Sequence, residues 1–236
     1  MKITQVKDPA EVWPYFYEFC VKSKPYDFCS LKSRTLRDSR IKSVFQEFCT
    51  YKVYKAEKED GPFLFAFVKN EDVCLDLAFI FGISAKASSS KIGSTAPVLL
   101  KKAVEDSDKF YCKSEIRRIF KVGHFKKWIE KYYKNAMILN DENNTVIFCN
   151  KNIMTVKFKV VGTNKTTDHL LGKEAFLKNT RRVKHGLMRE IAIDEKIYLL
   201  DEKGVDFLSE SVLLNGLISD NENNVGNISL QFIPNK

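Results

Sequence analysis

Glycine, proline and histidine are scarce in this chain of 236 residues, which has 10 glycines, 6 prolines and 3 histidines. With so few histidines, and no two cysteines spaced as Cys-x-x-Cys, the sequence argues against a metal site. No apolar run reaches 18 residues, and no apolar stretch follows the opening Met-Lys-Ile-Thr-Gln. We therefore expect a protein of the cytoplasm that is not secreted and has no membrane span.

Six cysteines are present, at positions 20, 29, 49, 74, 112 and 149. Cys74, Cys112 and Cys149 lie in apolar, strand-like runs, where a free cysteine behaves as a small hydrophobic residue. This usage fits a reducing compartment.

The formal net charge is +9, from 39 lysines and arginines against 30 acidic residues. Such a surplus favours acidic partners, whether nucleic acid, a phosphate-bearing ligand or an acidic protein surface, although a solvated basic surface explains it equally well. Lysine far outnumbers arginine and asparagine is abundant. That usage resembles translation from an AT-rich genome, as in many phages and their hosts.

Hydrophobic periodicity predicts an α+β protein with two parts. The first, residues 1–161, reads as β-α-α-β-β-β-α-β-α-β-β, and the second, 162–236, as a mostly β segment, arm or small domain. Asp8 and Pro9 supply a helix start. The remaining elements are expected as helices at 39–48, 95–105, 122–137 and 168–178 and as strands at 51–57, 63–68, 73–81, 109–116, 146–149, 154–161, 188–193, 196–200 and 228–233.

The loop 82–95, between an apolar strand and a helix, is the most informative stretch. A strand, a small-residue loop and a helix N-terminus together present free N–H groups and a positive dipole end to an anion. The pattern does not complete a P-loop, because Gly82 and Gly93 are too far apart and Lys91 precedes its glycine.

The order of elements over residues 1–161 resembles the Gcn5-related N-acetyltransferase (GNAT) fold, a mixed sheet flanked by helices. The resemblance implies that Ile92, Gly93, Ser94 and Thr95 hold the pyrophosphate of acetyl-CoA through their N–H groups, and that Tyr132 or Tyr133 acts as the general acid. Gly93 matches the first glycine of the family signature. Ser90 stands where the family has Arg or Gln, and Thr95 where it has Gly or Ala.

A basic cluster at Arg181, Arg182, Lys184 and Arg189 is the predicted partner or nucleic-acid contact, with a solvated loop as the alternative. From these observations we favour a non-enzymatic assembly protein, of the kind found in phage virions or head-to-tail connectors, built on a degenerate GNAT-like core. It would need no cofactor and would contact other protein subunits, as a homo-oligomer or in a larger assembly. A CoA-dependent N-acetyltransferase is the alternative, and a basic nucleic-acid-binding module is a weaker one.

Overall fold

The computed structural model describes residues 1–83, 89–115, 136–138, 145–149, 157–162, 170, 173–183, 186–220 and 223–233. Side chains are described at 1–83, 92–115, 170, 173, 188–220, 225–231 and 233. The helices are η1 (Pro9–Val12), α1 (Trp13–Ser23), η2 (Asp27–Ser30), α2 (Arg34–Phe48) and α3 (Ser89–Glu105). The strands are β1 (Lys2–Gln5), β2 (Lys52–Lys58), β3 (Gly61–Asn70), β4 (Leu75–Gly82), β5 (Tyr111–Glu115), β6 (Ala136–Ile138), β7 (Thr145–Cys149), β8 (Lys157–Gly162), β9 (Glu174–Val183), β10 (Gly186–Ile193), β11 (Lys196–Phe207), β12 (Val212–Asp220) and β13 (Asn223–Ile233).

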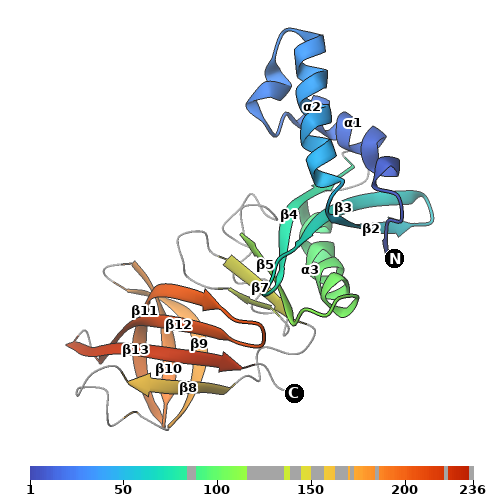
Figure 1. The fold of residues 1–236 in the computed structure, drawn as a ribbon. Helices are drawn as coiled ribbons and strands as arrows, with labels where there is room; N and C mark the ends of the chain where they lie inside the picture. The colour runs from blue at the N-terminus through green and yellow to red at the C-terminus, as the bar shows by residue number, and fades with distance from the viewer. Residues whose placement is uncertain are drawn as a thin grey trace.

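The protein is α+β, as predicted, with a mixed sheet, helices and a separate antiparallel sheet. The mixed sheet has the order β1-β2-β3-β4-β5-β7-β6. Its strands pair antiparallel except for β4 and β5, which run parallel and are connected through α3. Figure 1 shows this sheet in the middle of the molecule, with α1 and α2 at one end and the second sheet at the other.

The two faces of the mixed sheet are covered by different helices, and β3 shows how. Leu64, Ala66 and Val68 are buried with α3, whereas Phe65 and Phe67 are buried with α1 and α2. Successive side chains of a strand point to opposite faces. A strand covered on both faces is therefore apolar throughout, as the run from Phe63 to Val68 is.

Aromatic rings fill the space between α1, α2 and the sheet. Phe16 of α1 is fully buried and meets Phe67 and Phe81 nearly edge-on, at centroid distances of 6.1 and 5.7 Å. Phe48 of α2 stacks on Phe67 at 5.0 Å. Aromatic pairs at such distances add roughly 0.5–1.5 kcal/mol each beyond the area that they bury. This layer fixes the helical hairpin to the sheet.

The second sheet closes into a six-stranded barrel of order β10-β11-β12-β13-β8-β9. Its strands follow one another antiparallel along the chain, and β13 returns to pair with β8. Alternate residues fill the interior, among them Tyr198, Leu200, Leu214 and Ile218, each no more than 4% exposed. Closure removes the unpaired edges that an open sheet would carry.

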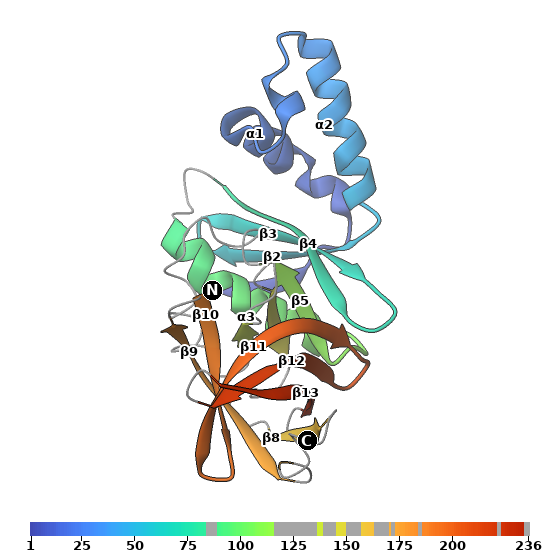
Figure 2. The same cartoon turned by 90° about the vertical axis from the view of Figure 1, so that its left-hand side faces the viewer.

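The barrel shares a hydrophobic core with the mixed sheet. Tyr111 of β5 and Cys74, just before β4, are buried in the same cluster as barrel residues such as Leu200 and Val212. Figure 2 shows β5 directly above β11 and β12. The carboxyl-terminal strands are therefore joined to the sheet by packing as well as by the chain.

Several predicted elements differ from the observed ones. Two strands expected in the first part of the chain lie in different sheets: residues 146–149 lie in β7, which pairs with β5 and β6 of the mixed sheet, whereas residues 157–161 of the expected 154–161 strand lie in β8 of the barrel. Ala136 and Met137, predicted at the end of a helix, lie in β6, and the rest of that helix lies outside the described residues. The predicted helix 168–178 is contradicted at 174–178, which lie in β9. β12 was not predicted at all.

Candidate functional site

The expected pyrophosphate-binding residues lie inside α3. This helix begins at Ser89, six residues before the predicted start, so Gly93, Ser94 and Thr95 are its fifth, sixth and seventh residues. Only about the first four N–H groups of a helix lack an intrahelical partner. The expectation that the N–H groups of these three residues face an anion is therefore wrong, because the helix itself uses them.

The side chains of this turn are used in packing. Thr95 is only 5% exposed, and its hydroxyl contacts the sulfur of Met1 at 3.8 Å. Ile92 packs partly buried against the core beneath α3, and Ala96 is completely buried there. The β-carbon at position 95, where the family has glycine or alanine, thus contributes to the core.

The parallel strands β4 and β5, which α3 connects, pair over a short stretch and then continue beyond it; we call the place where their pairing ends the opening between them. Among the described residues, the two strands pair at two positions, Leu75 opposite Cys112 and Asp76 opposite Lys113. On its other side, β4 has a bulge at Ala78, because Phe67 is opposite Phe79 while Val68 is opposite Leu77. β4 then continues to Gly82 beyond its described pairing with β5.

The titratable groups beside this opening are mostly buried. Burial raises the pKa of the Cys112 thiol well above its usual value, and nearby Asp76 raises it further. Tyr54, on β2 under α3, is also fully buried, and burial raises its pKa to about 12. Its hydroxyl has no hydrogen-bond partner among the described atoms. At neutral pH both groups are protonated, so neither is poised to accept a proton.

Tyr132 and Tyr133, the expected general acids, lie outside the described residues, as does Lys184. Arg181 and Arg182 lie on β9, where the structure gives their backbone positions only. Their roles remain predictions.

Arg189 is a clear correction to the predicted basic cluster. Its side chain is 5% exposed and its Nε donates to Oε1 of Glu202 at 2.5 Å, while the Glu202 side chain is 1% exposed. Burial of this pair inside the barrel contradicts the expectation that Arg189 contacts a partner. Charge alone did not distinguish it from its neighbours, but its place in the alternating run Arg189, Ile191, Ile193 indicates the inward face.

Sequence reasoning missed an exposed basic region on the helical hairpin. Lys32, Arg34 and Arg40 are exposed there, around the start of α2. Its signal in the sequence is a stretch of seven basic and two acidic residues at 22–42, but charge counting alone does not single it out, because residues 117–137 contain seven basic residues and one acidic residue.

The described residues contain no group of three or more histidine, cysteine or acidic side chains able to hold a metal ion. No helix in the described part of the chain is long and apolar enough to cross a membrane. Comparison with protein-family models, with curated protein sequences and with solved structures returns no match. The function must therefore be argued from this chain's own residues.

Proposed function

We propose that this chain is a non-enzymatic assembly protein, in which a GNAT-like mixed sheet and a closed barrel act as one scaffold for protein partners. The observation that carries the proposal is the packing of Gly93 and Thr95. Gly93 and Thr95, two of the positions expected to hold a pyrophosphate, are buried, whereas Ser94 between them is exposed. The helix α3 uses the backbone N–H groups of all three. A composition typical of AT-rich genomes supports a virion or connector component as the setting.

The barrel supports the same proposal. Its inward side chains fill the interior, with Leu200, Leu214 and Leu230 fully buried. A small barrel filled by its own side chains acts through its outer surface. Its attachment through Tyr111 and Cys74 holds that surface in a fixed relation to the mixed sheet. A rigid two-part body is suited to setting the distance between neighbouring subunits.

A CoA-dependent N-acetyltransferase is the second candidate, and one observation favours it. The succession β1, α1, α2, β2, β3, β4, α3, β5 is the one that the family resemblance implies, and α3 connects the parallel pair β4–β5. In that function, the cofactor would bind along the opening between these two strands. The phosphate-binding N–H groups would then have to come from residues before Gly93.

Isothermal titration of the full chain with acetyl-CoA separates the two functions. The assembly proposal expects no heat of binding at millimolar cofactor. Binding in the micromolar range that Gly93→Trp abolishes would overturn it, provided that the variant keeps the circular dichroism spectrum and melting temperature of the wild type. Val98→Trp is the control, because Val98 lies five residues further along α3 and is 41% exposed.

A further inference from the structure

The hairpin of α1 and α2 carries a concentrated positive charge. Six of the seven basic residues between positions 22 and 42 are exposed, and the seventh, Arg37, is half-buried. We call this set the basic tip: Lys22, Lys24, Lys32, Arg34, Arg37, Arg40 and Lys42.

Only part of this charge is neutralised within the hairpin. Asp38 accepts from both Arg34 and Arg37, at 3.5 and 3.3 Å, and Lys22 pairs with Glu18. No ion pair among the described residues involves Lys24, Lys32, Arg40 or Lys42. Like charges held close together repel one another, so the basic tip raises the free energy of the isolated chain unless an anionic surface approaches it.

Two exposed leucines lie among the cations of the basic tip. Leu36, in the first turn of α2, is 60% exposed, and Leu31, just before the helix, is 40% exposed. Leu36 and Arg40 are four residues apart and share one helix face. Exposed leucines among cations favour a protein partner, because leucine gains nothing from contact with phosphates.

One part of the barrel is acidic, although residues 157–233 as a whole are balanced, with eleven acidic and eleven basic residues. Residues 190–222 contain nine acidic residues and two basic ones. On and beside β11, Glu195 and Asp206 are exposed. Asp201 lies between them on the outward side, since its neighbour Leu200 is fully buried, and it pairs there with Lys203. Ile197, 49% exposed, lies in the same row. We call these four residues the acidic barrel face.

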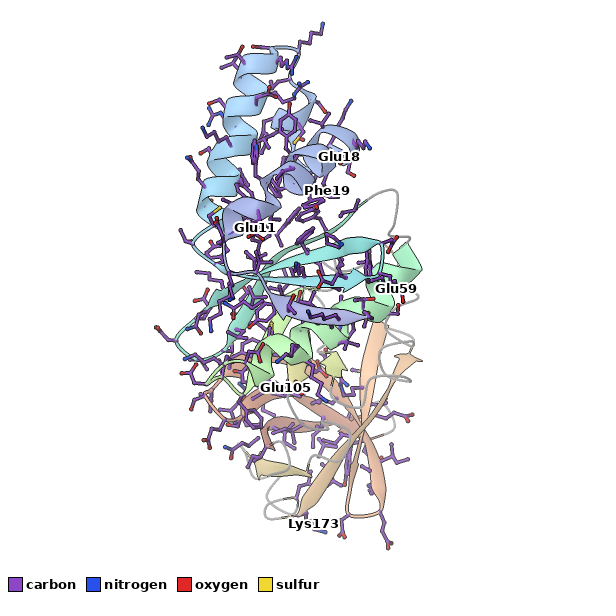
Figure 3. The ribbon with its side chains drawn as sticks, turned by 90° about the vertical axis from the view of Figure 1, so that its right-hand side faces the viewer. Glu11, Glu18, Phe19, Glu59, Glu105 and Lys173 are labelled. Atoms are coloured by element: carbon purple, nitrogen blue, oxygen red, sulfur yellow. The ribbon has the colours of Figure 1, made fainter. Side chains whose placement is uncertain are left out.

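The two surfaces belong to distant parts of the molecule. In Figure 3, Glu18 on α1 lies at one end and Lys173 at the other. Lys173 pairs with Asp194, the residue before Glu195, so the row of the acidic barrel face begins at the end opposite the hairpin. The acidic barrel face of one chain therefore cannot neutralise the basic tip of the same chain.

We propose that the basic tip of one copy binds the acidic barrel face of a second copy, head to tail. The contact would place Leu31 and Leu36 against Ile197, with the cations of α2 facing the carboxylates of β11. The inference rests on the proposed assembly function and names the partner. An interface between two different surfaces of one chain continues from copy to copy, closing into a ring or extending as a filament.

Sedimentation velocity of the full chain tests this contact, over on the order of a hundredfold range of concentration. At about 0.05 M NaCl we expect species larger than a monomer that grow with concentration. At about 0.5 M NaCl, where screening is strong, we expect monomer. A chain that stays monomeric in both salts would overturn the inference.

Charge reversals identify the surfaces. Lys32→Glu with Arg40→Glu (the tip variant) and Glu195→Lys with Asp201→Lys (the barrel variant) should each weaken self-association at least about tenfold, or about 1.4 kcal/mol. Lys7→Glu with Lys58→Glu is the control for the tip variant, because both lysines are exposed and the change of net charge is the same. Melting temperatures should be checked for all variants.

Mixing the two variants is the decisive measurement. The native tip of the barrel variant faces the native barrel of the tip variant, and the reversed tip of the tip variant faces the reversed barrel of the barrel variant. Both contacts in the mixture are therefore complementary, so the mixture should assemble although each variant alone stays largely monomeric. A chain carrying all four changes should assemble again, because its surfaces remain complementary with exchanged signs.

The other outcomes are also informative. Oligomers that persist in both variants would overturn the head-to-tail contact and leave the assembly function standing. If the wild type instead binds a fluorescent DNA duplex and the tip variant does not, the basic tip is a nucleic-acid surface and the inference is wrong. Acetyl-CoA binding in the titration above would count against the assembly function itself.

Discussion

The hydroxyl of Tyr111 donates a hydrogen bond to the carbonyl oxygen of Leu208, 2.9 Å away. Tyr111 begins β5 of the mixed sheet, and Leu208 follows β11 of the barrel. The ring of Tyr111 also lies 6.0 Å from that of Phe207, whose face in turn receives the ammonium group of Lys113 at 5.3 Å. This small group of contacts joins the two halves of the protein.

Removing the hydroxyl should weaken the junction measurably. We expect Tyr111→Phe to lower the free energy of unfolding by about 0.5–1.5 kcal/mol, because the Leu208 carbonyl loses its donor. Tyr111→Ala should cost about 3–5 kcal/mol, since the side chain is 1% exposed and a cavity would remain. Urea unfolding followed by circular dichroism measures both. Equal losses in the two variants would contradict this account of the junction.

Removing one partner of the buried pair of Arg189 and Glu202 should lower the free energy of unfolding strongly, whereas replacing both partners by apolar residues should lower it much less. We expect Arg189→Met alone to lower stability by about 3–5 kcal/mol, because the buried Glu202 carboxylate would lose the opposite charge that it faces. The double change Arg189→Met with Glu202→Leu should recover most of that loss. Urea unfolding of the two single variants and the double variant gives the coupling free energy directly. A strictly additive result would show that the two charges do not depend on each other.

Substitution by alanine should lower the stability of the protein at one glycine of the barrel and leave it unchanged at another. A Cβ atom at Gly216 would lie 2.5 Å from the Asp201 carbonyl oxygen and 2.8 Å from Cδ1 of Leu200, whereas one at Gly204 would have no atom within 4 Å. We expect Gly216→Ala to cost about 1–3 kcal/mol through overpacking. Gly204→Ala should be neutral within about 0.5 kcal/mol. Thermal melting of both variants checks the contrast.

Alkaline pH should destabilise the protein partly through Cys20. Burial, with a smaller contribution from neighbouring Cys29, raises the pKa of the Cys20 thiol from 9.0 to about 12. The folded state therefore keeps a proton that the unfolded state releases, so the stabilisation is complete below pH 9 and is lost as the pH rises toward 12.

Urea unfolding at several pH values between 9 and 12 measures this effect. Stability of the wild type should fall with pH more steeply than that of Cys20→Ala, by up to about 1.4 kcal/mol per pH unit. Other buried groups that titrate in this range, such as Tyr54, are common to both chains and cancel in the comparison. Identical slopes would contradict the raised pKa.

The fold could be predicted from the sequence where one periodicity dominates. The apolar run at Phe63–Val68 indicated a buried strand, and the stripe of Ile41, Phe45 and Phe48 indicated a helix; both are observed. The prediction failed at β12, which was not identified as a strand; Asn215 and Gly216, a residue pair typical of turns, lie within it. Gly216 is there because the backbone of β11 leaves no room for a Cβ, which is a tertiary cause invisible in a local pattern.

The candidate site was predicted less well, for a related reason. Small residues before Gly93 resemble a loop, but α3 extends back to Ser89 and the helix uses the N–H groups that were expected to be free. Arg189 was grouped with exposed cations because sequence distance ignores the alternation of a strand. The basic tip lies within residues 22–42, and it was overlooked because charge counting alone does not show which basic stretch of the chain is exposed.

Closure of the barrel also affects how the protein is made. β8 completes its pairing only with β13, which leaves the ribosome roughly 60 residues later. Until then, the edge of β8 that β13 will cover stays open while β9 to β12 are synthesised. A ribosome that stalls in this interval would release a chain with two unpaired strand edges, and such edges promote aggregation. Correct assembly should therefore depend on uninterrupted translation through β13 more than on any single contact within the barrel.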